Sequence, residues 1–223
     1  MKPFTTAVTA SVVAIGAAFL VTPVLAQAPS PAAPGAAAPA AANQPNESQM
    51  MKQMMELAKL NENHKLLASL NGNWTYVVKF WMNGDASAKP QESRGTAVRK
   101  SIMGGRYVMM DVSGNMEMPG EDGKMKKMEF KGHAMEGYDN VKKKFVSTWM
   151  DNMGTGIMMS EGTYDPASKT FTYTSEYEAM PGMKMQVRET VTIMDNDHMK
   201  LEWFEVRGGQ EVKTMEIVYT RKK

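Results

Sequence analysis

Residues 64–74 read His-Lys-Leu-Leu-Ala-Ser-Leu-Asn-Gly-Asn-Trp, and this stretch decides the fold class of the chain. The stretch is predicted to contain the end of a helix, a turn at Asn71-Gly72 and the start of a strand at Trp74. From that point the apolar pattern has a period of two, which is typical of a β-strand with one buried face. The large apolar residues of that face are Trp74, Tyr76, Val78, Phe80 and Met82.

Turn signals then recur at short and regular intervals to the end of the chain, from Asn83-Gly84 to Gly208-Gly209. The spacing leaves no room for crossover helices, so it predicts an antiparallel meander of about ten strands. A meander of this length closes, because closure removes its unpaired edges. We therefore expect an all-β, up-and-down antiparallel barrel of eight to ten strands over residues 66–223. After the strand at Trp74, the expected strands are Thr96–Ser101, Tyr107–Met116, Met125–Gly137, Lys144–Asp151, Gly156–Gly162, Thr170–Glu178, Met185–Met194, His198–Val206 and Lys213–Arg221.

Residues 47–65 are predicted to form a short amphipathic helix before the barrel, with Ser48 as a possible N-cap. Met50, Met54 and Leu57 lie on one face of such a helix. We expect this face to pack on the barrel or to close one end of it. The alternative is a helix that binds a partner protein.

The N-terminal segment indicates export. A lysine at position 2 precedes an uncharged apolar run from Ala7 to Ala26, which ends in the small-residue pattern Val24-Leu25-Ala26. This predicts a secretory signal peptide over 1–26 and a periplasmic or extracellular protein with no membrane span after cleavage. The alternative is a retained membrane helix. Residues 27–46 hold mainly Ala and Pro with no charge or aromatic residue, so we expect a disordered spacer there.

The composition argues against nucleic acid as a partner and excludes disulfide bonds. The chain has 26 basic and 24 acidic residues, and loss of the signal peptide removes one lysine, so the mature charge is close to zero. Such a balance gives no basic field for nucleic acid. The chain has no cysteine, so neither a disulfide nor a lipid-modified cysteine is possible. The composition does not determine an oligomeric state.

The start and the end of the barrel region together resemble the calycins, which are small barrels that hold ligands. In calycins a Gly-x-Trp opens the first strand, and an arginine of the last strand stacks over the indole. Gly72-Asn73-Trp74 fits the first element, and Arg221 shares a strand face with Ile217 and Tyr219. The resemblance implies that Arg221 covers Trp74 and closes the barrel. The alternative is an exposed terminal arginine beside Lys222 and Lys223.

Three strings within the barrel region resemble a bacterial secreted family known as domain of unknown function 1579 (DUF1579). They are residues 137–145 (GYDNVKKKF), 149–156 (WMDNMGTG) and 161–165 (EGTYD). The opening His64-x-x-Leu67-x-x-Leu70-x-Gly72-x-Trp74, the step at 105–107 and the ending 215–222 are similar too. The resemblance covers residues 60–222 and implies a calycin-like barrel. It brings no activity and no catalytic residues.

The residues themselves offer no catalytic site and no motif for a metal. There is no Gly-x-Ser-x-Gly elbow and no cysteine nucleophile. The three histidines, His64, His133 and His198, are far apart, and no zinc-binding spacing occurs. A haem held by a single histidine is the alternative left open. We therefore expect neither an enzyme nor a metal site, and the identity of any cofactor is undetermined.

The chain is rich in methionine, with 24 residues of this type. Those near the two Pro-Gly turns, Met116, Met118, Met180, Met183 and Met185, offer thioethers that suit Cu(I) in an oxidising compartment. The alternative is that methionine fills irregular gaps in the core or lines adaptable surfaces.

The leading prediction for function is non-catalytic binding of a small apolar molecule inside the barrel. One alternative is a methionine-rich protein of the cell envelope that binds copper or resists oxidative stress. Another is a protein-interaction module that docks through its helix or its barrel mouth. The residues predicted to line the ligand or fill the core are Trp74, Tyr76, Phe80, Trp149, Tyr173 and Trp203.

Overall fold

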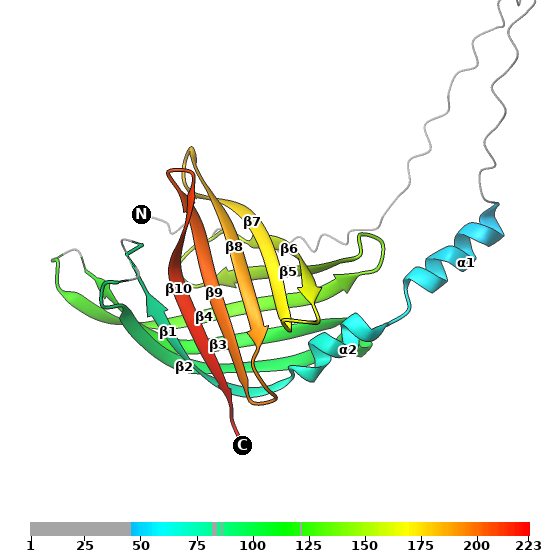
Figure 1. The fold of residues 1–223 in the computed structure, drawn as a ribbon, viewed down its shortest axis with the longest axis horizontal. Coiled ribbons are helices and arrows are strands. Elements are labelled where there is room, and N and C mark those ends of the chain that lie inside the picture. Colours follow the sequence, from blue (N-terminus) through cyan, green and yellow to red (C-terminus); the bar gives the residue numbers. More distant parts are fainter. Residues whose placement is uncertain (1–45, 82–83, 86, 121) are drawn as a thin grey trace, which may run out of the picture. The chain divides into compact units, whose positions relative to one another are not determined.

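The computed structural model describes residues 46–223 except 82–83, 86 and 121. The predicted signal peptide and almost all of the predicted spacer lie outside these residues. The described part holds ten antiparallel strands in one closed barrel, which confirms the predicted fold class (Figure 1). Each strand pairs with the next along the chain, and β1 pairs with β10. The strands are β1 Gly72–Phe80, β2 Gln91–Ile102, β3 Tyr107–Pro119, β4 Met125–Asp139, β5 Lys144–Asp151, β6 Met158–Asp165, β7 Thr170–Met180, β8 Met183–Ile193, β9 His198–Arg207 and β10 Gln210–Arg221.

Most strands match their predicted ranges within a few residues, and β2 is the largest exception. It begins at Gln91 instead of Thr96, because Gln91 pairs with Phe80 at the far end of β1. This extra pairing places Gly95 opposite Tyr76. A Cβ at Gly95 would collide with the ring of Tyr76, so the absent side chain makes room for an inward aromatic.

The helical segment is longer than predicted and is divided into α1 Glu47–Leu57 and α2 Glu62–Ser69. Asn46, not Ser48, is the N-cap of α1, and its side chain accepts a hydrogen bond from the backbone of Gln49. Asn61 caps α2 in the same way and starts a new helix, which explains the division. A short 3₁₀ turn, η1 Met103–Gly105, links β2 to β3.

The two helices differ in burial. In α2, His64 and Leu67 are buried, and the helix packs near the start of β3 and the end of β4. No residue of α1 is buried, and Met54 on its predicted packing face is 63% exposed. The prediction that this face packs on the barrel is therefore wrong for α1, and α2 covers the barrel end instead.

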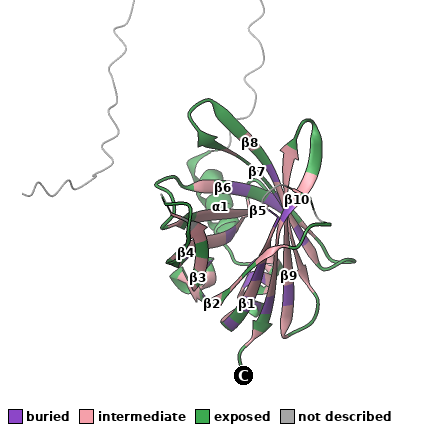
Figure 2. Ribbon diagram, turned by 90° about the vertical axis from the view of Figure 1, so that its left-hand side faces the viewer, coloured by how far each residue is buried: buried purple, intermediate pink, exposed green. Residues whose placement is uncertain are grey.

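The core lies inside the barrel, where alternate residues of the strands meet. Trp74, Tyr76 and Val78 of β1 lie beside the inward residues of β10 in register. Many inward residues near α2 are buried, among them Leu67, Trp74 and Phe171. The tip of the β7–β8 hairpin at the opposite end is exposed and forms a green loop in Figure 2. We call the end beside α2 the closed end and the opposite end the open end.

Candidate functional site

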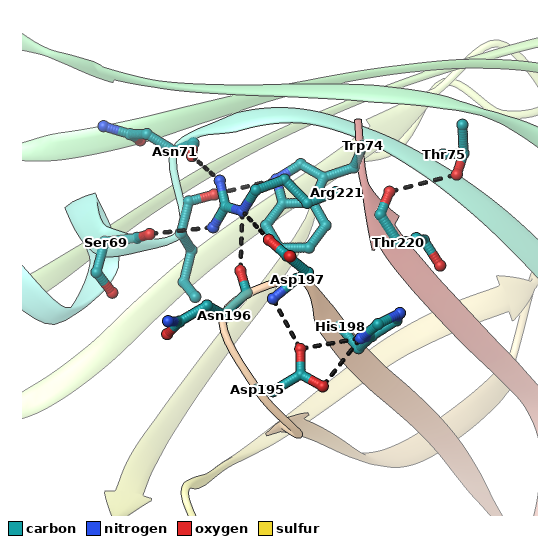
Figure 3. A network of polar contacts seen from close by, with 11 residues as sticks. Ser69, Asn71, Trp74, Thr75, Asp195, Asn196, Asp197, His198, Thr220 and Arg221 are labelled. Atoms are coloured by element: carbon teal, nitrogen blue, oxygen red, sulfur yellow. Dashed lines mark hydrogen bonds and ion pairs between the residues drawn. The ribbon is translucent and has the colours of Figure 1, made fainter. Parts of the chain in front are cut away.

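The closed end is sealed by a stack of Arg221 on Trp74. The guanidinium carbon of Arg221 lies 4.2 Å from the centre of the indole ring (Figure 3). Trp74 is fully buried, and its indole N–H donates a hydrogen bond to the Leu70 carbonyl at 3.2 Å. The stack therefore joins the first strand, the last strand and the end of α2.

Arg221 also binds the surrounding backbone. Its Nε donates to the Asn196 carbonyl at 2.8 Å, and its two terminal nitrogens donate to the carbonyls of Ser69 and Asn71 (Figure 3). Gly72 lies beside it with a φ of 137°, where a Cβ would be 2.5 Å from a guanidinium nitrogen. The first position of the Gly-x-Trp motif therefore requires glycine for a steric reason, because any side chain there would displace Arg221.

The middle of the barrel contains a buried ion pair. Arg99 of β2 is 6% exposed and contacts both carboxylate oxygens of Glu136 on β4, one of them at 3.1 Å. The Nε of Arg99 is buried and has no hydrogen-bond partner. A buried donor without a partner is costly and uncommon, so this nitrogen marks a place where a further polar group fits.

Glu189 of β8 is a second acidic residue of the interior. Its register neighbours are Tyr173 on β7 and Trp203 on β9. Burial, reinforced by the nearby charge of Glu136, raises the pKa of Glu189 to about 7, and Arg99 opposes this rise. No ion pair to Glu189 occurs among the described residues. A carboxyl group therefore lies inside the barrel without a cation of its own.

Two tyrosines complete this polar layer, which we define as Arg99, Glu136, Tyr173, Glu189 and Tyr219. Burial raises the pKa of Tyr173 and that of Tyr219 well above the ordinary value, so both phenols are neutral at physiological pH. The five residues come from β2, β4, β7, β8 and β10. Strand alternation places all five on the inward face, where Arg99 contacts Glu136 and Glu189 is the register partner of Tyr173.

The space between the polar layer and the open end is surrounded by apolar side chains that are only partly buried. They point inward and pack against the core without being covered. This group consists of Phe80, Phe130, Trp149 and Met215, and Trp203 is partly buried in the same region.

The structure separates the six residues predicted to line a ligand or to fill the core. Trp74 belongs to the closed end, and Tyr76 and Tyr173 are buried in the middle. Phe80, Trp149 and Trp203 are the partly buried members. Strand alternation places all six on the inward face, and these last three lie nearer the open end than Trp74.

The sequence prediction missed the charged members of the polar layer. The alternation of strand faces is the signal that could have identified them. Glu136 lies on the same strand face as Ala134 and Tyr138, and Glu189 lies on the same face as Val187 and Val191. A charged residue at an apolar position of a period-two pattern indicates a charge inside the barrel.

The described part of the molecule contains two hollows. One has a volume of about 850 Å³, and its wall contains outward residues such as Met135 and Met159 as well as the inward residues Glu136, Ser175 and Val187. The other, of about 340 Å³, lies by the junction of α1 and α2, with His64 and Arg106 in its wall. Because Arg99 and Glu136 form a buried ion pair in the interior, we place the candidate site there.

The residues considered for a metal are spread over the molecule. His64 is buried in α2, while His133 contacts Asp111 at 2.8 Å and His198 contacts Asp195 at 2.9 Å. Among the described residues, no three side chains of His, Cys, Asp or Glu are grouped to hold a metal ion. The five methionines proposed for copper lie on the β3–β4 and β7–β8 hairpins, which β5 and β6 separate in the barrel order.

Comparison with known proteins identifies the family. Residues 59–221 match the model of the family described as protein of unknown function DUF1579. The chain belongs to the DUF1579 family. A closed barrel of ten antiparallel strands is consistent with the calycin-like fold that the resemblance implied.

Other comparisons add little to this DUF1579 chain. Among solved structures it is similar to a redesigned β-barrel, with 13% identity and a TM-score of 0.34 over 71% of this chain and 96% of that one. A search among curated proteins gave no match. Within the part of the chain that the structure describes, no helix has the length and apolar character needed to cross a bilayer.

Proposed function

We propose that this protein binds a small, mainly apolar molecule inside the barrel, between the polar layer and the open end. The observation that carries the proposal is the contrast between the two halves of the interior. The largest fully buried side chains, such as Trp74, Phe171 and Met199, lie toward the closed end, whereas Phe130, Trp149 and Trp203 toward the open end are only partly buried.

The chemistry of this region suits such a ligand. Ligand sites are mostly apolar and contain a few polar groups that orient the molecule. Here Trp149, Trp203 and Phe130 supply apolar surface, and the Nε of Arg99 supplies an unused donor at the base. Apolar surface beside a few polar groups is the chemistry of a binding site, so ligand binding is the function that this region supports best.

A pair of substitutions tests this location. Ser175 points inward from β7 opposite buried Val187, and the adjacent Thr174 points outward. We expect Ser175→Phe to fill the space above the polar layer and to abolish binding of the neutral probe N-phenyl-1-naphthylamine. Thr174→Phe is the matched control and should leave binding intact. Probe fluorescence in a titration measures both.

Thr174 and Ser175 both line the hollow of about 850 Å³, so the pair tests which face of β7 the ligand contacts. Loss of binding in Thr174→Phe but not in Ser175→Phe would place the ligand outside the barrel and contradict the proposal. Circular dichroism spectra that match the wild type show that both variants keep the barrel.

A further inference from the structure

We propose that the ligand carries a positively charged amine, which pairs with Glu189 inside the barrel while its apolar part lies toward the open end. This inference rests on the proposed function and specifies the chemical class of the ligand as an apolar organic cation. It is carried by the pairing of the charges in the polar layer and by the neighbours of Glu189.

The pairing of charges leaves one position for a cation. Arg99 is the only basic residue of the polar layer, and both oxygens of Glu136 already contact its guanidinium group. Glu189 is therefore the member without a counter-ion. An ionised carboxylate taken out of water without a partner is strongly destabilising, so the folded protein gains when a cation reaches it.

The two cross-strand neighbours of Glu189 also favour an amine. Tyr173 and Trp203 are its register partners on either side, so their rings share the inward face with the carboxyl group. Directly opposed side chains of an antiparallel pair are within contact distance. A carboxylate between aromatic rings suits an ammonium group, because the ring faces attract the cation as well.

An anionic ligand is disfavoured by the same groups. Glu136 and Glu189 both lie in the layer, and the single positive charge of Arg99 is used by Glu136. An anion placed there would be repelled by Glu189, and the unpaired Nε–H of Arg99 would offer it a single donor of a guanidinium group that Glu136 already neutralises. A neutral molecule would leave the carboxyl group unpaired and would gain only apolar contacts.

Three molecules with one apolar chain and different head groups test the charge preference. Octylammonium, 1-octanol and octanoate compete with N-phenyl-1-naphthylamine for the wild-type protein at about pH 8.5, where Glu189 is ionised. We expect octylammonium to bind about tenfold more tightly than 1-octanol, as for a charge-assisted contact, and octanoate to bind most weakly.

The pH dependence and a variant assign the preference to Glu189. At about pH 5.5 Glu189 holds its proton, so octylammonium should lose its advantage over 1-octanol. Of the other groups around it, Arg99 stays charged, Glu136 is paired with Arg99, Tyr173 and Tyr219 stay neutral, and Trp203 does not titrate. Glu189→Gln should remove the preference at both pH values while binding of 1-octanol persists.

Glu161→Gln is the matched control, because Glu161 is an exposed glutamate of β6. It should behave as the wild type. Equal binding of octylammonium and 1-octanol, tighter binding of octanoate, or a preference that survives Glu189→Gln would overturn the amine inference while the proposed function stands. If none of the three molecules displaces the probe and the probe itself does not bind, the proposed function fails as well.

Discussion

Arg221 closes the barrel through contacts of two kinds, a stack on Trp74 and hydrogen bonds to backbone carbonyls of α2 and of the β8–β9 turn. We expect Arg221→Ala to lower the free energy of unfolding by about 2–4 kcal/mol, since both the stack and these bonds are lost. Trp74→Ala should cost about 3–5 kcal/mol. The double variant should lose less than the sum, because both changes remove one contact.

Urea unfolding measures these losses. Arg94→Ala serves as the control, because Arg94 is a largely exposed arginine of β2 and its loss should change stability by less than about 0.5 kcal/mol. Strictly additive losses for Arg221 and Trp74 would show that the stack contributes nothing to stability.

Glu189 makes the stability of the ligand-free protein depend on pH. Its pKa rises from 4.5 to about 7 on folding, so the folded protein holds a proton that the unfolded chain releases. The stability linked to this proton is present below about pH 4.5 and is lost as the pH rises through 7, a difference of about 3 kcal/mol.

Glu189→Gln removes this dependence, since the amide is neutral at every pH. We expect the variant to exceed the wild type in stability by about 1–3 kcal/mol above pH 7 and to match it near pH 5. Thermal unfolding over that range is the measurement. A variant that is less stable than the wild type above pH 7 would contradict the buried, unpaired state of Glu189.

At the scale of elements, the two helices have separate roles. Removal of residues 1–55 deletes most of α1, which has no buried residue, and should leave the midpoint of thermal unfolding within a few degrees of the full chain. Leu67→Ala in α2 should instead cost about 2–5 kcal/mol, because Leu67 is 2% exposed in the core. A large loss of stability on removing α1 would show that its methionine face is covered in solution.

At the scale of the whole molecule, we propose that the protein is exported and that residues 1–26 are removed. The charged start, the apolar run and the small residues before Gln27 support a cleavage site there. The mature N-terminus is then expected at Gln27 or within a few residues of it. The intact mass of protein isolated from the envelope or medium of its host decides this, and a mass that includes residues 1–26 would refute it.

Local sequence patterns are sufficient to predict the barrel. Period-two alternation and regular turn signals are local properties, and each strand of a meander pairs with its neighbours along the chain, so topology follows from order. The strand Lys144–Asp151 was predicted with the bounds that the structure has. Local signals also indicated an N-terminal helical segment, but the Asn61 cap that divides it passed unnoticed.

The partners of the interior charges depend on contacts between strands and cannot be predicted from local patterns. Whether Arg99 reaches Glu136, and whether Glu189 finds a cation, depends on side chains from strands that meet across a closed interior. The alternation of strand faces can predict that a residue points into the barrel, but it predicts neither the partner of that residue nor its degree of burial. The same holds for α1, since an amphipathic pattern shows which face is apolar but does not show whether anything covers it.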